Sequence, residues 1–265
     1  MSGWRIDVVD VATIPQLPLS GFLPAAGLAE AGLAEAGLAE AWLTNDVLID
    51  VPCFSFLLTS DSGTVLVDTG PDPARAAQAG FQARGEPAQA MLGALARRGR
   101  GPQDVDLIVH THLHYDHMQN DGIFPRAVVV IQQQEASWAT GPDADQFCLS
   151  VAGFLSGMAD RLWLLDGERE VLPGIRVLPT GGHTPGHQAV LLRTPDAAEG
   201  LTCIAGDLVP LRANLRHVQP SCRDPAAVRA FLARARHESW QVVPSHDPQL
   251  RTAPAGGPEP SCSDP

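Results

Sequence analysis

The chain has 265 residues, of which 45% are hydrophobic, and this is enough apolar material to bury the core of a globular protein. Its formal net charge of −12 opposes the phosphate backbone of nucleic acids and the anionic surface of a membrane, so neither is an expected partner. All 18 cationic residues are arginine, which excludes catalysis through a lysine Schiff base or a lysine general base.

The N-terminal segment has acidic residues where a secretory signal needs an uninterrupted apolar run, and no later run is long enough for a membrane span. We therefore expect a cytoplasmic protein. The five cysteines are odd in number, far apart and never paired as CxxC. This pattern is typical of reduced thiols rather than of a disulfide framework or a thiolate zinc site, so we expect most of them to be small core residues.

Strands and helices alternate along the chain. Helical periodicity is found at 86–99, where Met91, Leu92 and Leu95 share a face, and at 223–237, where Asp224 can cap a helix that begins at Pro225. No long linker separates the two similar halves, so residues 1–251 are expected to form one α/β domain of sheets covered by helices. About ten strands are predicted from β-branched or alternating apolar runs, at 4–12, 53–60, 63–70, 106–112, 127–133, 161–167, 175–180, 187–194, 201–207 and 239–247.

Two segments are expected to be peripheral. Residues 26–42 repeat a pentapeptide, and a five-residue step turns each leucine by about 140° around a helix, so the repeated leucines cannot share one face. This predicts a short alanine-rich helix or a flap, and both a lid over the site and a solvent-exposed insertion agree with it. Residues 252–265 are rich in Pro, Gly and Ser and are predicted to be a disordered tail.

The stretch HTHLHYDH, residues 110–117, follows the apolar run at 106–109 and concentrates imidazoles in a short space. If the strand continues to this point, alternation places His112 and His114 on one face, while Asp116 and His117 follow as the chain turns. Burying these groups together without a cation would leave polar atoms unpaired at about 1–3 kcal/mol each. The motif therefore predicts a metal site, and we expect His110 to pack or to support a ligand.

THLHYDH resembles the HxHxDH signature of the metallo-β-lactamase superfamily, and further segments resemble that family in the expected order. These are VLVDTG at 65–70, GGHTPGHQ at 181–188, IAGD at 204–207 and VPSHD at 243–247. The resemblance implies a four-layer αββα sandwich with the metals at one edge of the two sheets. It also implies that His112, His114 and His183 hold a first metal ion, that Asp116, His117 and His246 hold a second, and that Asp207 bridges both.

The resemblance implies a dinuclear hydrolase in which a hydroxide shared by two divalent ions attacks a carbonyl. Zinc is expected, with iron or manganese as alternatives because the ligands are nitrogen and oxygen only. The substrate is expected to be a small molecule, and the sequence allows an oligomer without requiring one. A thioesterase of the glyoxalase-II or acyl-carrier type is the principal alternative, and a β-lactamase or a non-catalytic metal-binding scaffold ranks below it.

Within the superfamily the motifs are most similar to those of N-acyl homoserine lactone lactonases, which favours a lactone or a related ester. Those lactonases place a tyrosine after the bridging aspartate, whereas this chain continues with the apolar run Leu208, Val209 and Pro210. We expect this run to line an apolar cleft, joined by residues 28–42 if they lie over the site. Protonation of the leaving group is expected from Asp116 or from water on the second metal. Asp68 is expected to orient a ligand histidine. Tyr115 and His187 are expected to have structural roles. Arg212–His217 is expected to form a loop whose side chains either meet substrate or are solvated.

Overall fold

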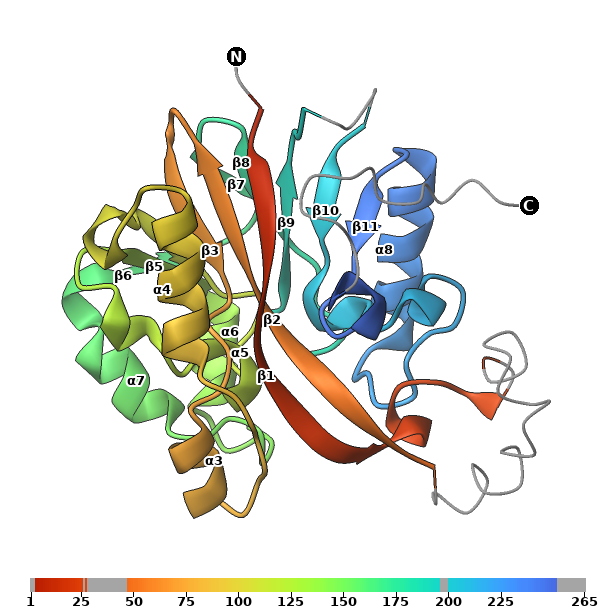
Figure 1. Cartoon of the computed structure of the whole chain (residues 1–265). Helices are drawn as coiled ribbons and strands as arrows, with labels where there is room; N and C mark the ends of the chain where they lie inside the picture. The colour runs from red at the N-terminus through yellow and green to blue at the C-terminus, as the bar shows by residue number, and fades with distance from the viewer. Residues whose placement is uncertain (1–2, 26, 28–46, 196–199, 252–265) are drawn as a thin grey trace.

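The computed structural model describes residues 3–25, 27, 47–195 and 200–251, which form two β-sheets packed face to face (Figure 1). The first sheet, in spatial order, contains β1 (Arg5–Pro18), β2 (Leu48–Ser60), β3 (Gly63–Val67), β4 (Leu107–Val109), β5 (Val128–Gln132) and β6 (Leu162–Leu165). The second sheet, in spatial order, contains β11 (Gln241–Val243), β10 (Thr202–Ile204), β9 (Gln188–Leu192), β8 (Ile175–Pro179) and β7 (Arg169–Leu172).

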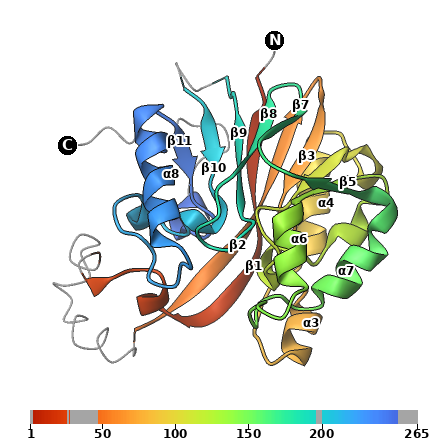
Figure 2. The same ribbon diagram turned by 180° about the vertical axis from the view of Figure 1, so that it is seen from behind.

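Helices cover the outer face of each sheet, as the two opposite views show (Figures 1 and 2). The second sheet is covered by α8 (Pro225–His237). The first sheet is covered by α3 (Pro73–Gln78), α4 (Pro87–Arg97), α5 (Tyr115–Met118), α6 (Gln133–Ala139) and α7 (Val151–Gly157). The order of layers is helix, sheet, sheet, helix, and the predicted αββα sandwich is confirmed.

Three apolar clusters hold these layers together. One lies between the two sheets and includes Phe56, Val67 and Val190. A second joins the first sheet to its helices, and a third joins the second sheet to α8 through residues such as Phe231. Because interior side chains are close-packed, these clusters fix the distance between the sheets and therefore the place where loops from the two sheets meet.

The edge where these loops meet follows from the strand directions. β3, β4 and β5 run parallel to one another, and β10 runs parallel to β11. The carboxyl ends of parallel strands lie at the same edge of their sheet, and loops at such an edge are a common place for a site. The segments that follow β3, β4, β10 and β11 contain all the sequence motifs named above, except the third-histidine loop, which is the turn between β8 and β9.

The sequence prediction was wrong in several details. The strand predicted at 106–112 ends at Val109, so His112 and His114 lie in the loop that follows and not on a strand face. The edge strand β7 was not predicted, because only Val171 of its four residues is buried and the run has no apolar pattern. The helices predicted at 86–99 and 223–237 correspond to α4 and α8, whereas the shorter helices α3, α5, α6 and α7 were not predicted. Of the expected face of α4, Met91 and Leu95 are buried while Leu92 is partly exposed.

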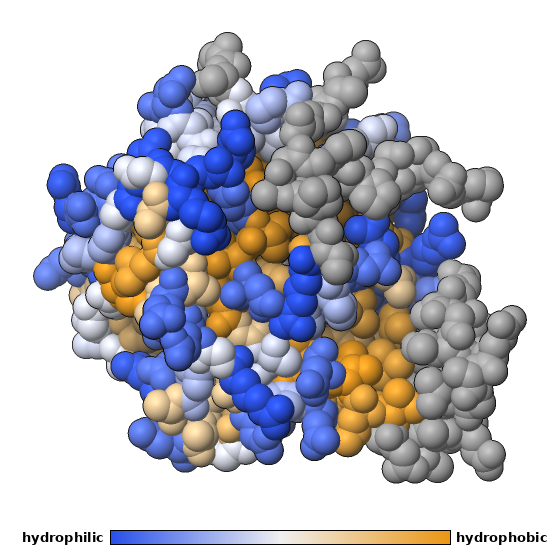
Figure 3. All heavy atoms as spheres, in the orientation of Figure 1, coloured by the Kyte–Doolittle hydropathy of each residue, from blue (hydrophilic) through white to orange (hydrophobic). Residues whose placement is uncertain are grey.

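On the face shown in Figure 3, apolar surface is visible at the lower right, where β1 ends and β2 begins, and also in the centre and on the left of the molecule. The exposed Leu48 lies at the start of β2. No helix within the described ranges is long and apolar enough to cross a membrane. Apart from Gly27, the predicted repeat at 26–42 lies outside the described residues, as does the tail at 252–265. That residues 1–251 form one domain stays a prediction.

The cap of α8 provides a test of the fold. The Asp224 carboxylate accepts hydrogen bonds from the backbone N–H groups of Ala226 and Ala227, at 2.9 and 3.1 Å, as the sequence predicts for a helix that begins at Pro225. Asp224→Ala is expected to lower the free energy of unfolding by about 1 kcal/mol in chemical denaturation. Arg229→Ala, at an exposed position of the same helix, is the control, and equal effects of the two substitutions would contradict the capping role.

Candidate metal centre

Four segments that are distant in the sequence bring the predicted ligands to one place. The loop after β4, with α5, supplies His112, His114, Asp116 and His117. The turn between β8 and β9 supplies His183, and the segments after β10 and β11 supply Asp207 and His246. All of these residues are buried except Asp116 and His183, which are partly buried, so the fold holds a polar cluster at the edge of its core.

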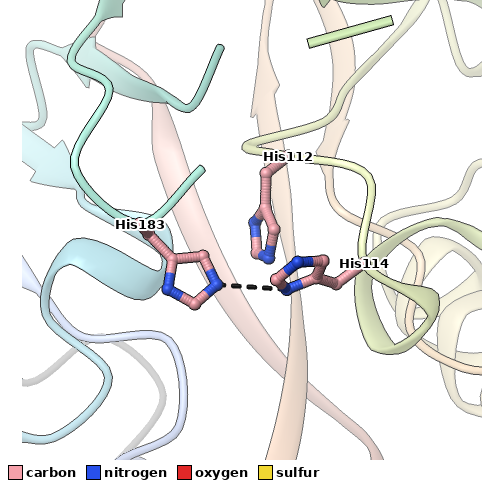
Figure 4. A group of neighbouring side chains, drawn as sticks. All are labelled: His112, His114 and His183. Atoms are coloured by element: carbon pink, nitrogen blue, oxygen red, sulfur yellow. Dashed lines mark hydrogen bonds between the residues drawn. The ribbon is translucent and has the colours of Figure 1, made fainter. Parts of the chain in front are cut away.

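The first group consists of His112, His114 and His183, whose rings face one another across the gap between the two sheets (Figure 4). The Nε2 atom of His183 lies 3.1 Å from the Nδ1 atom of His114. One ring nitrogen from each of the three residues lies within 4.8 Å of the others, a spacing at which they could hold one metal ion. The structure thus brings together the three residues that the sequence assigns to the first metal.

The second group surrounds the carboxylates of Asp116 and Asp207. The Nε2 atom of His117 lies 3.5 Å from Asp116 Oδ2 and 3.4 Å from Asp207 Oδ1. The Nε2 atom of His246 lies 3.7 Å from Asp116 Oδ2 and 3.0 Å from Asp207 Oδ1. The other oxygen of Asp207, Oδ2, lies 3.6 Å from His183 Nε2 in the first group. Asp207 therefore stands between the two groups, with one oxygen toward each.

The unpaired donors of this cluster fit divalent metal ions. Three buried ring nitrogens, His112 Nε2, His117 Nε2 and His183 Nδ1, have no hydrogen-bond partner among the described residues. In His114 and His183 two imidazole nitrogens face each other, and they cannot both present lone pairs without a proton or a cation between them. Neutral imidazole and carboxylate are the ligand types that zinc and similar ions take in proteins.

The electrostatics keep His112 and Asp207 in the form that a metal requires. Burial lowers the pKa of His112 well below its usual range, and the neighbouring His117 and His114 lower it further. Burial alone would raise the pKa of Asp207, but the charges of His246 and His117 lower it well below its usual range. At neutral pH His112 is thus uncharged and Asp207 is ionised, as metal ligands must be. For His117 and His246, burial alone would lower the pKa, but nearby carboxylates raise it well above its usual range, so a metal would have to displace a proton there.

Polar residues behind the cluster orient the imidazoles. Asp68 accepts a hydrogen bond from His117 Nδ1 at 2.8 Å, which leaves Nε2 of that ring directed toward Asp116 and Asp207. The same carboxylate accepts bonds from the N–H and hydroxyl of Thr111. His110 is fully buried and its Nε2 lies 2.8 Å from Asp121. The orienting role predicted for Asp68 and the supporting place of His110 agree with these contacts.

Sequence reasoning missed a carboxylate that joins the two histidine loops. Glu135, in α6, is 1% exposed, and its Oε1 accepts a hydrogen bond from the Leu113 N–H at 2.9 Å. Its Oε2 accepts bonds from the Thr184 hydroxyl at 2.7 Å and from the Gly186 N–H at 3.0 Å. Burial raises the pKa of Glu135, and these hydrogen bonds oppose the rise. No pattern in the sequence indicates this role of Glu135, because the residues that hydrogen-bond to it are far from it along the chain.

Gly186 is required at this contact. A Cβ atom at this position would lie 2.1 Å from the backbone nitrogen of Glu135, so no larger residue fits without moving α6.

A second residue that sequence reasoning missed is Asp145, whose Oδ2 lies 3.2 Å from His114 Nε2 and 3.1 Å from an Arg223 guanidinium nitrogen. Asp145 thereby leaves the Nδ1 atom of His114 to face His183.

The structural roles predicted for Tyr115 and His187 agree with their surroundings. Tyr115 is buried against Phe81, with ring centroids 5.1 Å apart, and His187 Nδ1 lies 2.8 Å from the Thr180 hydroxyl. In the Arg212–His217 loop, Asn214 is buried and donates to the carbonyls of Phe22 and His217, so this side chain is not free to meet substrate.

The expected apolar wall formed by Leu208, Val209 and Pro210 is wrong. All three residues are buried, and Leu208 and Val209 pack in the cluster beneath α8. Their apolar character is explained by this packing, and they do not line a cleft.

The fold and this cluster define an αββα protein with donors for metal ions at the edge of its sheets. The family model of the metallo-beta-lactamase superfamily matches residues 48–241. The chain belongs to the metallo-beta-lactamase superfamily.

Individual relatives agree with this membership. An N-acyl homoserine lactonase from Bacillus sp. is 30% identical over 172 residues, which are 61% of this chain and 66% of that protein. Human metallo-beta-lactamase domain-containing protein 1 is 33% identical over 190 residues, 71% of this chain and 60% of that protein. Each match therefore spans less than two thirds of the length of the relative.

Solved structures with the same fold include an N-acyl homoserine lactone hydrolase with the product N-hexanoyl-L-homoserine bound at its catalytic metal centre. It has a TM-score of 0.73 and 22% identity, and the match covers 97% of this chain and 98% of that one. The dizinc quorum-quenching lactonase AidC has a TM-score of 0.68 and 16% identity, with 94% and 89% covered. At these identities the likeness shows the fold alone.

The Glu135 contact provides a second prediction. Glu135→Ala removes the acceptor that fixes both histidine loops, and the loss of such a supporting partner typically costs about 10–100-fold in metal affinity. We expect a fall of this size in zinc affinity measured by competition with a chelator, and a smaller fall for Glu135→Gln, which keeps one acceptor oxygen. Gln134→Ala, at the exposed neighbouring position, is the control. If Glu135→Ala binds zinc as tightly as this control, the carboxylate does not position the ligands.

Proposed function

We propose that this protein is a metal-dependent hydrolase that opens a lactone or a related ester of a small molecule at a dinuclear centre. In this proposal His112, His114 and His183 hold one ion, Asp116, His117 and His246 hold the other, and Asp207 bridges them. The observation that supports it most strongly is the position of Asp207, with one carboxylate oxygen toward each group. Two divalent ions bound there would lower the pKa of a water molecule and polarise a substrate carbonyl.

The chain's own residues would then orient these groups and move protons. Asp68 fixes the His117 ring, and Ser245 donates a hydrogen bond to Asp207 Oδ1 at 2.6 Å, which fixes the bridging carboxylate. Asp116 has the most exposed side chain of the second group, at 13% against 10% for Asp207 and 3% for His117. Its carboxylate is the group best placed to take a proton from the attacking water and return it to the leaving oxygen.

Aromatic side chains near the first group favour an acyl substrate. The Phe147 ring lies 5.4 Å from the His114 ring and is 37% exposed. The Trp138 ring lies 6.2 Å from His114, and the Arg223 guanidinium stacks on it at 4.7 Å. Such rings provide the apolar wall that the sequence analysis wrongly assigned to Leu208–Pro210, and an apolar wall accommodates an acyl chain or a hydrophobic ring.

Substitution of the second group tests the assignment of ligands. Asp116→Asn and His117→Ala are expected to abolish hydrolysis while the protein stays folded, because both side chains serve the nucleophile more than the core. Asp207→Ala is expected to release both ions and also to lower Tm, since an ion that binds only the native state stabilises it by mass action. Activity, metal content and thermal unfolding are measured on the same samples. Retention of most activity in Asp116→Asn or His117→Ala would refute the assignment.

A substrate panel tests the proposed reaction. The metal-loaded protein is assayed on homoserine lactones of several acyl lengths, simple lactones, acyl thioesters and a chromogenic β-lactam. We expect turnover of lactones that increases with the length of the acyl chain. Slow turnover of every lactone with fast turnover of a thioester would overturn this choice in favour of a thioesterase. Phe147→Ala should reduce the preference for long chains, whereas the exposed Leu164→Ala, at β6, should not.

A further inference from the structure

A buried thiol lies beside the second group of donors. Cys53, in β2, is 1% exposed, and its Sγ atom lies within 4.8 Å of a carboxylate oxygen of Asp116 and a ring nitrogen of His246. Burial raises the pKa of the Cys53 thiol to about 11, and the neighbouring His246 imidazole opposes the rise. The preceding residue, Pro52, accepts a hydrogen bond from His246 Nδ1 at 2.7 Å. This stretch of β2 therefore fixes the His246 ring and places a sulfur atom next to it.

Other donors are directed toward the same point. Because its Nδ1 atom is bound to Pro52, His246 turns Nε2 toward Asp116 Oδ2, at 3.7 Å, and Asp207 Oδ1, at 3.0 Å. His117 Nε2 lies 3.5 Å from Asp116 Oδ2, and it is a buried nitrogen without a hydrogen bond in the described part of the chain. A zinc ion lies about 2.3 Å from a thiolate sulfur and about 2.0 Å from an imidazole nitrogen, so one ion can contact neighbouring donors at such spacings.

We propose that Cys53 is a further ligand of the second metal ion, which it binds through Sγ together with Asp116, His117 and His246. This inference rests on the proposed dinuclear centre. On binding, the S–H bond breaks, a bond between sulfur and the metal forms, and the proton leaves to solvent. The second position then has a mixed donor set of sulfur, nitrogen and oxygen. A thiolate favours zinc or cobalt over manganese, so the two positions differ in the metals that they prefer.

The other cysteines provide matched controls. Cys203, in β10, is also fully buried, but it packs in the apolar cluster beneath α8. Cys148 is the rival thiol, because its Sγ atom lies within 4.8 Å of donor atoms of His114 and Asp145, beside the first group. A sulfur–metal bond at the centre could therefore come from Cys53 or from Cys148, and single substitutions distinguish the two.

Cobalt(II) is the probe, because a thiolate bound to it gives a charge-transfer band in the near ultraviolet, whereas nitrogen and oxygen ligands give only the weaker visible bands. The full-length apoprotein is titrated with cobalt(II) and compared with Cys53→Ser, Cys53→Ala, Cys148→Ser and Cys203→Ala. We expect the band in the unaltered protein and in the last two variants. Both Cys53 variants should lose it while the visible bands persist, and Cys53→Ser should release one proton fewer per chain on loading.

Visible bands without a charge-transfer band in the unaltered protein would overturn the role of Cys53 and leave the proposed dinuclear centre intact. A band that survives both Cys53 substitutions and disappears in Cys148→Ser would also overturn it. If one of the two Cys53 variants does not fold, the charge-transfer band of the other variant decides whether Cys53 binds the metal. Absence of cobalt binding in the unaltered protein would contradict the dinuclear centre itself, and this inference would fall with it.

Discussion

The structure depends on the burial of one polar cluster at the edge of an apolar core. The residues of both groups come from segments that follow strands of both sheets, and all are buried except Asp116 and His183, which are partly buried. A buried polar atom without a partner costs about 1–3 kcal/mol, and three ring nitrogens of the cluster have no hydrogen bond in the described ranges. Two cations would satisfy these donors at once. In the proposed centre the fold and the metal ions therefore stabilise each other, since ions that bind only the native state add their binding free energy to folding.

Each half of the cluster is oriented by contacts that do not involve a metal. The second ring nitrogen of His114 lies beside Asp145, that of His117 beside Asp68, and that of His246 beside the Pro52 carbonyl. These contacts select the tautomer in which the remaining nitrogen faces the other donors. Glu135 then ties the loop of His112 and His114 to the loop of His183. The ligand geometry is thus set by the packing of helices and strands, which reduces the ordering that metal binding requires.

The sequence pattern predicted sheets covered by helices, and the family resemblance implied the four layers. The predicted ligands come together in the structure, but the sequence did not indicate which contacts hold them in place. HxHxDH is a local motif, whereas His183, Asp207 and His246 could be placed only through a family resemblance. The contacts of Glu135 and Asp145 join residues far apart in the chain, so no spacing in the sequence indicates them. Cys53 was covered only by the expectation that most cysteines are small core residues, and it does pack in the core cluster of the first sheet. Leu208 was assigned to a cleft because an apolar run looks alike whether it lines a wall or packs beneath a helix.

The most direct measurement of the central claim is anomalous diffraction at the zinc absorption edge from crystals of the zinc-loaded protein. The account predicts two anomalous peaks per chain, one among His112, His114 and His183 and the other among Asp116, His117 and His246, with Asp207 in contact with both. A single peak, or two peaks of which neither is in contact with Asp207, would contradict it.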